Sequence, residues 1–365
     1  EYWRHHEFTH IKPFFCQVEA VETLIWLTEV APKNKQGRNF LKYLEKSNQV
    51  ANSELNRLAL KLATGAGKTM VMAMLIAWQA INAARRPNSK KFTNGFLIVT
   101  PGITIRDRLR VLQPNDPDNY YFKNELIPTD FFPELNKAKI VITNFHAFIT
   151  REKFKLAKVS RSLLQGRGAE IETTESEGQM IQRVIPELMG MKNILVFNDE
   201  AHHCYRKKIK DSEEAKLTGD EREEAQANNQ DARVWMTGLE SINRVIGIDR
   251  VVDLSATPFF LSGSGYREGT LFPWTMSDFS MMDAIECGII KLPRVPIRDN
   301  IPEKDMPTYR NLWKHISKDM PKKGRASSKK ELDPEQLPVR LQSAIEALYG
   351  HYEETHKLWD KAGIE

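Results

Sequence analysis

The amino-acid sequence predicts an α/β fold in which a mostly parallel sheet carries helices on both faces. Short continuous apolar runs recur along the chain, separated by polar or helical stretches, at residues 58–62, 96–99, 140–142, 194–197 and 251–254. Such runs are typical of strands that are buried on both faces, and these strands need helices on either side. Apolar residues make up 41% of the 365 and charged residues 28%, a composition that supports a real core and excludes a disordered chain.

The elements follow in order from the N-terminus. Residues 1–50 are predicted to be a helical lead-in, because Val18, Val21 and Leu24 recur at helical spacing. A long apolar helix is predicted at 70–84, with its methionines and Trp78 buried. Its apolar stretch of nine residues, 70–78, is too short to span a bilayer, so we expect no membrane segment.

Polar and charged segments interrupt this rhythm. Residues 151–182 are predicted to be an insertion, and the charged tract 206–231 an exposed helix or loop. Residues 291–330 contain twelve Lys or Arg against four Asp or Glu, although the whole chain carries only +5. A basic stretch can bind a polyanion, but the prolines here favour a solvated linker over 291–338. The predicted organisation is a domain at 1–290, this linker, and a helical start of a second domain at 339–365.

The three cysteines indicate the compartment. Cys16, Cys204 and Cys287 lie far apart and form no Cys-x-x-Cys pair, which excludes a disulfide scaffold and a four-cysteine zinc site and fits a reducing cytoplasm. No basic-then-apolar segment opens the chain, so a secretory signal is not expected. His202, His203 and Cys204 are adjacent and cannot easily converge on one tetrahedral zinc ion.

A candidate phosphate-binding loop lies between the first predicted strand and the long helix, where residues 63–69 read ATGAGKT. Gly65 and Gly67 allow backbone N–H groups to turn toward phosphate oxygens, and the helix N-terminus adds its positive end. Lys68 can reach the β- and γ-phosphates, and the Thr69 hydroxyl can ligate Mg²⁺. The alternative is a glycine turn that merely precedes a helix, since the generic pattern has glycine where this chain has Leu62.

Two further motifs follow predicted strands. Asp199 and Glu200 come directly after the run 194–197. A carboxylate at the carboxyl end of a parallel strand can ligate the same Mg²⁺, and its neighbour can take a proton from an attacking water. Ser255 and Thr257 follow the run 251–254; by physics alone they are equally a strand-ending turn.

Together these motifs resemble superfamily 2 helicases and translocases over about residues 8–292. The resemblance implies a RecA-like P-loop NTPase domain that uses ATP and Mg²⁺, with Lys68, Asp199 and Glu200 as catalytic residues and Thr69 and Asp199 as metal ligands. It also implies that Gln17 reads adenine beside the loop residues Thr64, Gly65, Ala66, Gly67, Lys68 and Thr69. His202, Ser255 and Thr257 then couple the ATP site to bound substrate. The residues that would face nucleic acid are Thr100, Pro101, Gly102, Thr143, Asn144 and Phe145.

A narrower resemblance is to the Res subunit of type III restriction enzymes. It rests on residues 198–205 (NDEAHHCY), on 15–20 (FCQVEA) and on 284–290 (AIECGII). It implies a motor that hydrolyses ATP on duplex DNA, through contacts without base reading, beside a methyltransferase subunit. Two alternatives stay open, an ATP-dependent RNA helicase and a non-catalytic nucleotide-binding scaffold.

The chain departs from the complete motor in one respect. After Pro338 only 27 residues remain, predicted as a helix over 339–358, so a second RecA-like domain and its catalytic arginine do not fit. We therefore expect this chain alone to hydrolyse ATP slowly. The triplet Glu214-Ala215-Lys216 matches half of a restriction-type nuclease motif, but in so charged a tract a solvated surface explains it better.

Overall fold

The computed structural model describes residues 1–151, 174–208, 219–291, 312–320 and 337–362. These residues belong to two compact units, Glu1–Lys291 and Leu292–Glu365, each described by itself. Several sequence predictions fall outside the described residues, namely most of the 291–338 linker, much of the 151–182 insertion and the triplet at 214–216.

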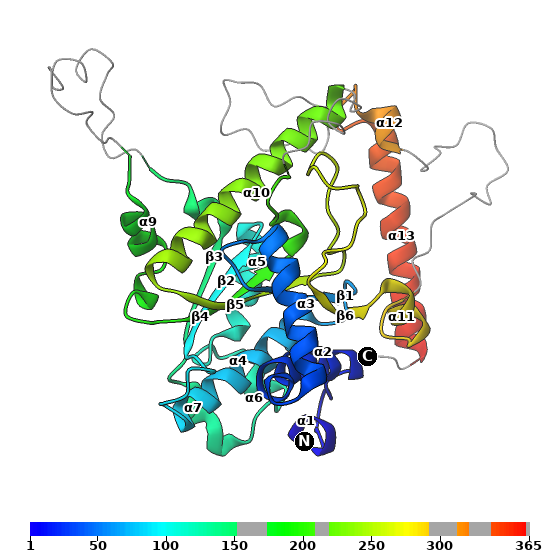
Figure 1. Ribbon diagram of the computed structural model, residues 1–365. Coiled ribbons are helices and arrows are strands. Elements are labelled where there is room, and N and C mark those ends of the chain that lie inside the picture. The colour runs from blue at the N-terminus through cyan, green and yellow to red at the C-terminus, as the bar shows by residue number, and fades with distance from the viewer. Residues whose placement is uncertain (152–173, 209–218, 292–311, 321–336, 363–365) are drawn as a thin grey trace, which may run out of the picture. The chain divides into compact units, whose positions relative to one another are not determined.

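A parallel sheet forms the centre of the first unit (Figure 1). In the described part of the chain it has six strands in the order β3-β2-β4-β5-β1-β6, and every neighbouring pair is parallel. The strands are β1 (Arg57–Leu62), β2 (Gly95–Thr100), β3 (Lys139–Asn144), β4 (Ile194–Asp199), β5 (Ile248–Ser255) and β6 (Thr275–Phe279). The predicted α/β fold with a mostly parallel sheet is confirmed.

Each face of the sheet has its own core. Leu60, Phe197 and Leu254 belong to a cluster with the buried residues of α2 (Phe15–Ile25) and α4 (Lys68–Arg85). Val196 and Val251 belong to a second cluster with residues of α9 (Glu177–Val184) and α10 (Gly219–Val245). Alternate residues of one strand therefore enter different cores, which places helices on both faces as Figure 1 shows.

The sequence runs predict five of these strands, and β6 is the one they miss. Its sequence, TMSDF, has no continuous apolar run, because it pairs only with β1 at the edge of the sheet and stays half-exposed along most of its length. The remaining early elements agree with a helical lead-in. Asn34 caps α3 (Lys35–Ala51) by accepting a hydrogen bond from the Gly37 N–H at 2.6 Å.

The other helices of the described residues are short, apart from one. They are α1 (Tyr2–His5), η1 (Trp26–Val30), η2 (Ala31–Lys33), α5 (Ile103–Arg108), η3 (Leu109–Leu112), α6 (Tyr120–Lys123), η4 (Thr129–Phe131), α7 (Phe132–Leu135), η5 (Phe145–Phe148), η6 (Pro186–Leu188), η7 (Ala201–His203), α11 (Met281–Glu286), α12 (Leu312–Ile316) and the long α13 (Val339–Ala362). None of the helices in the described ranges combines the length and apolar character needed to cross a membrane.

Candidate nucleotide-binding site

The candidate site lies at the carboxyl edge of the sheet. Because all strands are parallel, the loop after β1, the turn after β4 and the end of β5 emerge at the same edge, and these three strands are neighbours in the order β4-β5-β1. The predicted phosphate loop, Asp199, Glu200 and Ser255 are therefore brought together. In open parallel sheets this edge is where ligands bind.

The loop after β1 needs its glycines. Gly65 and Gly67 have φ of +86° and +82°, a left-handed conformation that side chains disfavour. A Cβ at Gly67 would also lie 2.3 Å from Nε2 of Gln17. The loop leads into α4, which begins at Lys68, so the unpaired N–H groups of the first turn and the positive end of the helix dipole point toward the loop.

Gln17 braces this loop from α2. Its side chain is buried; Oε1 accepts a hydrogen bond from the Phe14 N–H at 2.9 Å, and Nε2 donates one to the Ala66 carbonyl at 2.8 Å. The amide retains one N–H and one acceptor lone pair. The adenine contact stays a prediction, whereas the contact with the loop backbone is a feature that sequence reasoning did not provide.

Lys68 and Glu200 form an ion pair that joins the loop after β1 to the turn after β4. Both side chains remain partly accessible, at 13% and 29% exposed. Glu200 has φ of +51°, a strained conformation for this residue that aims its carboxylate back across the edge.

Asp199, at the end of β4, is almost fully buried. Burial raises the pKa of its carboxyl to about 6, with Glu200 adding to the rise and Lys68 opposing it. A buried carboxylate of this kind favours a nearby cation. Together with the Thr69 hydroxyl it offers oxygen ligands of the type that Mg²⁺ prefers, with phosphate and water as the usual remaining ligands.

His202 and Ser255 connect the ends of β4 and β5. His202 Nδ1 and Ser255 Oγ are hydrogen-bonded at 2.9 Å, and Ser255 Oγ also accepts from the Thr257 N–H at 3.0 Å. Burial, and then the neighbouring His203, lower the pKa of His202 to about 4, so its ring is neutral at pH 7. Glu200 Oε2 lies 3.6 Å from the same nitrogen. The three residues predicted to couple the site are thus in one hydrogen-bonded group, with Thr257 taking part through its backbone.

Comparison with known proteins identifies the family. Residues 10–260 match the family described as type III restriction enzyme, res subunit. The chain belongs to this family. Its res-subunit region is a helicase-like, ATP-dependent motor domain, and the match spans every site residue named above. Among curated proteins, none matches the chain at a significant level.

In this res-subunit domain the residues predicted to face nucleic acid are mostly turned inward. Phe145 is buried and its ring stacks on Trp235, with centroids 5.1 Å apart and an angle of 6° between the planes. The ring fills the core under α10, and a contact of Phe145 with nucleic acid stays a prediction. The Thr100 side chain is also buried; its hydroxyl donates to the Gly102 carbonyl at 2.9 Å.

The other residues of that group lie at two turns. The buried Thr143 hydroxyl donates to the Asn144 carbonyl at 3.3 Å, while the Asn144 side chain accepts from the Ala147 N–H at 3.1 Å and caps η5. Pro101 and Gly102, after β2, and Asn144 are partly exposed, and contacts with nucleic acid there stay a prediction.

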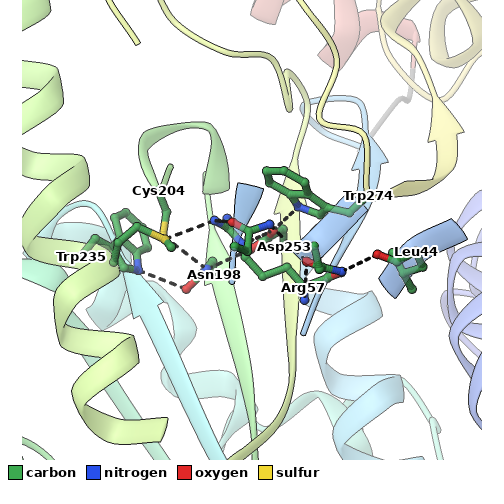
Figure 2. A network of polar contacts seen from close by, with 10 residues as sticks. Leu44, Arg57, Asn198, Cys204, Trp235, Asp253 and Trp274 are labelled. Atoms are coloured by element: carbon green, nitrogen blue, oxygen red, sulfur yellow. Dashed lines mark hydrogen bonds and ion pairs between the residues drawn. The ribbon is translucent and has the colours of Figure 1, made fainter. Parts of the chain in front are cut away.

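Sequence reasoning missed a buried polar group on the α10 side of the sheet (Figure 2). It contains Arg57, Asn198 and Asp253, which are fully buried polar residues on β1, β4 and β5. A signal was present, because a charged residue inside an apolar run such as VVDLS is stable in a core only when it is paired.

Proposed function

We propose that this chain binds ATP with Mg²⁺ at the loop after β1 and hydrolyses it to drive movement on duplex DNA. The observation that carries the proposal is the ion pair between Lys68 and Glu200, because it links the predicted phosphate loop to the predicted catalytic turn across two strand ends. A scaffold that only binds nucleotide has no need of a carboxylate in that place.

The residues divide the chemistry among them. Residues 64–69 cradle the phosphates, with Lys68 on the β- and γ-phosphates, and Gln17 contacts the adenine from α2. Thr69 and Asp199 hold Mg²⁺, which neutralises charge on the phosphates. Glu200 accepts the proton of the attacking water.

Entry of the nucleotide requires Lys68 to exchange partners. Its ammonium group pairs with Glu200, and both side chains are partly accessible to solvent. A triphosphate offers Lys68 a stronger charge-assisted contact. When the Lys68 ammonium group moves to the phosphate, the Glu200 carboxylate oxygen that it had contacted becomes free to accept a hydrogen bond from the water. The same exchange therefore binds the phosphates and activates the base.

The DNA part of the proposal rests on the family. A res-subunit motor acts on duplex DNA beside a modification methyltransferase subunit, in the cytoplasm, and we assign both partners to this chain on that ground. The DNA contacts are to the backbone and do not read bases, so affinity should fall steeply with salt.

The test compares three variants with the unaltered chain by calorimetry with Mg²⁺-ATP. Lys68→Ala should lower affinity about 10- to 100-fold, since a hydrogen bond to a charged group contributes about 1.5–3 kcal/mol. Glu200→Gln should keep affinity and, in a chain that turns over ATP, lose hydrolysis. Lys61→Ala is the matched control, because Lys61 is on β1 and pairs with Asp278 at 2.7 Å outside the proposed site.

Two results would contradict the proposal. Unchanged affinity in Lys68→Ala would remove the phosphate assignment, and equal loss of binding and hydrolysis in Glu200→Gln would make Glu200 a structural group. Stimulation of hydrolysis by duplex RNA but not by duplex DNA would favour an RNA helicase.

A further inference from the structure

Behind the candidate site lies a buried layer of polar side chains, formed by Arg57, Asn198, Trp235, Asp253 and Trp274 (Figure 2). We call it the Asp253 layer. All five side chains are fully buried. They come from β1, β4, α10, β5 and the residue before β6, so the layer joins the three strands whose ends form the site to α10.

Asp253 is the centre of the layer, and both oxygens of its carboxylate accept hydrogen bonds. Oδ2 accepts from Arg57 Nε and from Trp274 Nε1, both at 2.8 Å, and Oδ1 accepts from Asn198 Nδ2 at 2.9 Å. The Arg57 guanidinium also lies 5.0 Å from the centre of the Trp274 ring. Three donors thus hold the negative charge in a fully buried site.

Asn198 extends the layer from β5 to α10. Its Oδ1 accepts from Trp235 Nε1 at 3.1 Å while its Nδ2 donates to Asp253, so both ends of one amide are used. Trp235 in turn stacks on Phe145, the first residue after β3. One side chain therefore ties β4 to β5, to α10 and, through the indole, to the turn after β3.

Asn198 lies on β4 next to the proposed metal ligand, Asp199. Asn198 precedes Asp199 directly, and it pairs in register with Asp253 as Asp199 does with Leu254. Successive side chains of a strand point to opposite faces. Asn198 is thus held from the α10 side, while the side chain of Asp199 points to the α4 side.

An apolar core would fill the same space at lower cost. Burying an ion pair and an amide loses their hydration, and well-packed apolar residues in place of such groups are often neutral or more stable. Asn198, Trp235, Asp253 and Trp274 are each hydrogen-bonded within the layer, while Arg57 Nη2 has no hydrogen-bond partner among the described residues. Such directed bonds specify one arrangement of the elements that they join. The arrangement fixed here is that of the strand ends which carry the proposed Mg²⁺ ligand and the coupling pair His202 and Ser255.

We propose that Asn198 is a positioning residue of the ATP site, which holds the end of β4 through Asp253 and Trp235 so that Asp199 meets the Mg²⁺ of the bound nucleotide. The proposal rests on the function proposed above. It assigns to Asn198 no contact with nucleotide or metal.

The readout is the ratio of ATP affinity with Mg²⁺ to ATP affinity with EDTA, because only the metal-dependent part of binding depends on Asp199. Asn198→Leu keeps the volume but leaves Asp253 Oδ1 and Trp235 Nε1 without partners, and we expect this ratio to fall about 10-fold, as for residues that orient a metal ligand. Val196→Ala is the control, because Val196 lies on the same strand and face but is apolar.

A milder variant and an exchange cover the case in which Asn198→Leu does not fold. Trp235→Phe removes one N–H and keeps the stacking on Phe145, so a smaller fall in the ratio is expected. Asn198→Asp combined with Asp253→Asn retains the hydrogen bond between these two positions with donor and acceptor reversed, and leaves an acceptor oxygen for Arg57, Trp274 and Trp235. Asn198→Asp alone sets two carboxylates against each other. The affinity ratio should therefore be lower in Asn198→Asp than in the unaltered chain, and close to that of the unaltered chain in the combined variant.

The outcomes separate this inference from the proposed function. If the unaltered chain shows no Mg²⁺-dependent ATP binding, the proposed function fails. If it does bind, and Asn198→Leu or Trp235→Phe only lowers the midpoint of unfolding while the ratio matches that of Val196→Ala, the layer is merely structural and the positioning role is overturned.

Discussion

Two ion pairs of the first unit differ in what surrounds them. Lys68 and Glu200 are 13% and 29% exposed. Lys68 begins α4 directly after the phosphate loop, and Glu200 lies in a strained turn. Arg57 and Asp253 are both 0% exposed and come from two neighbouring strands. The first pair faces the place where a nucleotide would enter, and the second is closed in by Trp274, Asn198 and α3.

The difference teaches which charges can exchange partners. A partly hydrated pair contributes little to stability and can open for a phosphate at small cost. A pair without water cannot open, because each ion would be left uncompensated in the core. The same chemistry, a cation beside a carboxylate, is therefore suited to a changing contact in one place and to fixed geometry in the other.

The largest expected effect comes from breaking the buried pair. Asp253→Ala leaves the Arg57 guanidinium uncompensated, and we expect the free energy of unfolding to fall by about 3–5 kcal/mol. Urea denaturation measures this. The double variant Arg57→Met with Asp253→Leu should be more stable than Asp253→Ala, and a single-variant loss below about 1 kcal/mol would show that water reaches the layer.

The second prediction uses pH to sharpen the contrast. His202 has a pKa of about 4 in the folded chain against an ordinary 6.5, because it is buried. Between these values the unfolded chain binds a proton that the folded chain does not, so the contribution of His202 to stability is fullest above pH 6.5 and falls as pH drops toward 4, by at most about 3 kcal/mol. The raised pKa of Asp199 acts in the opposite direction over the same range, so the comparison is made with a His202 variant. Urea unfolding at pH 7 and pH 5 should show a smaller difference for His202→Gln, and an equal difference would contradict the assignment.

A third, smaller effect tests the loop that carries Lys68. Gly67→Ala places a side chain at φ +82° and against Nε2 of Gln17, and we expect a loss of about 1–2 kcal/mol in the free energy of unfolding. Gly178→Ala on α9, where a Cβ meets nothing within 4 Å, is the control and should not destabilise. Similar stability for both variants would mean that the loop readily adopts another conformation.

The smallest effect is expected at the partly accessible pair, Lys68 and Glu200. Glu200→Gln removes the partner of Lys68, but both groups are hydrated, so the free energy of unfolding should change by less than about 1 kcal/mol. The measurement is the same urea titration used for Asp253→Ala. A loss as large as in that variant would erase the distinction between the two pairs.

Much of the site follows from local sequence. The loop 63–69 and the turn that begins at Asp199 stand directly after apolar runs, so their place at strand ends could be predicted from periodicity alone. β6 could not, because an edge strand needs no apolar run. The burial of Phe145 could not either, because it depends on Trp235, ninety residues away on a helix that packs under the sheet.

The sequence by itself determined the fold class, the order of five of the six described strands along the chain and the residue types proposed to hold phosphate and metal. These are local properties of apolar runs, glycines and carboxylates. The tertiary structure alone decided that β5 lies between β4 and β1, that Lys68 meets Glu200, and that Asn198 and Asp253 share a buried layer. Those contacts join residues far apart in the chain, and their energies depend on burial and on which strands pair, neither of which a local pattern contains.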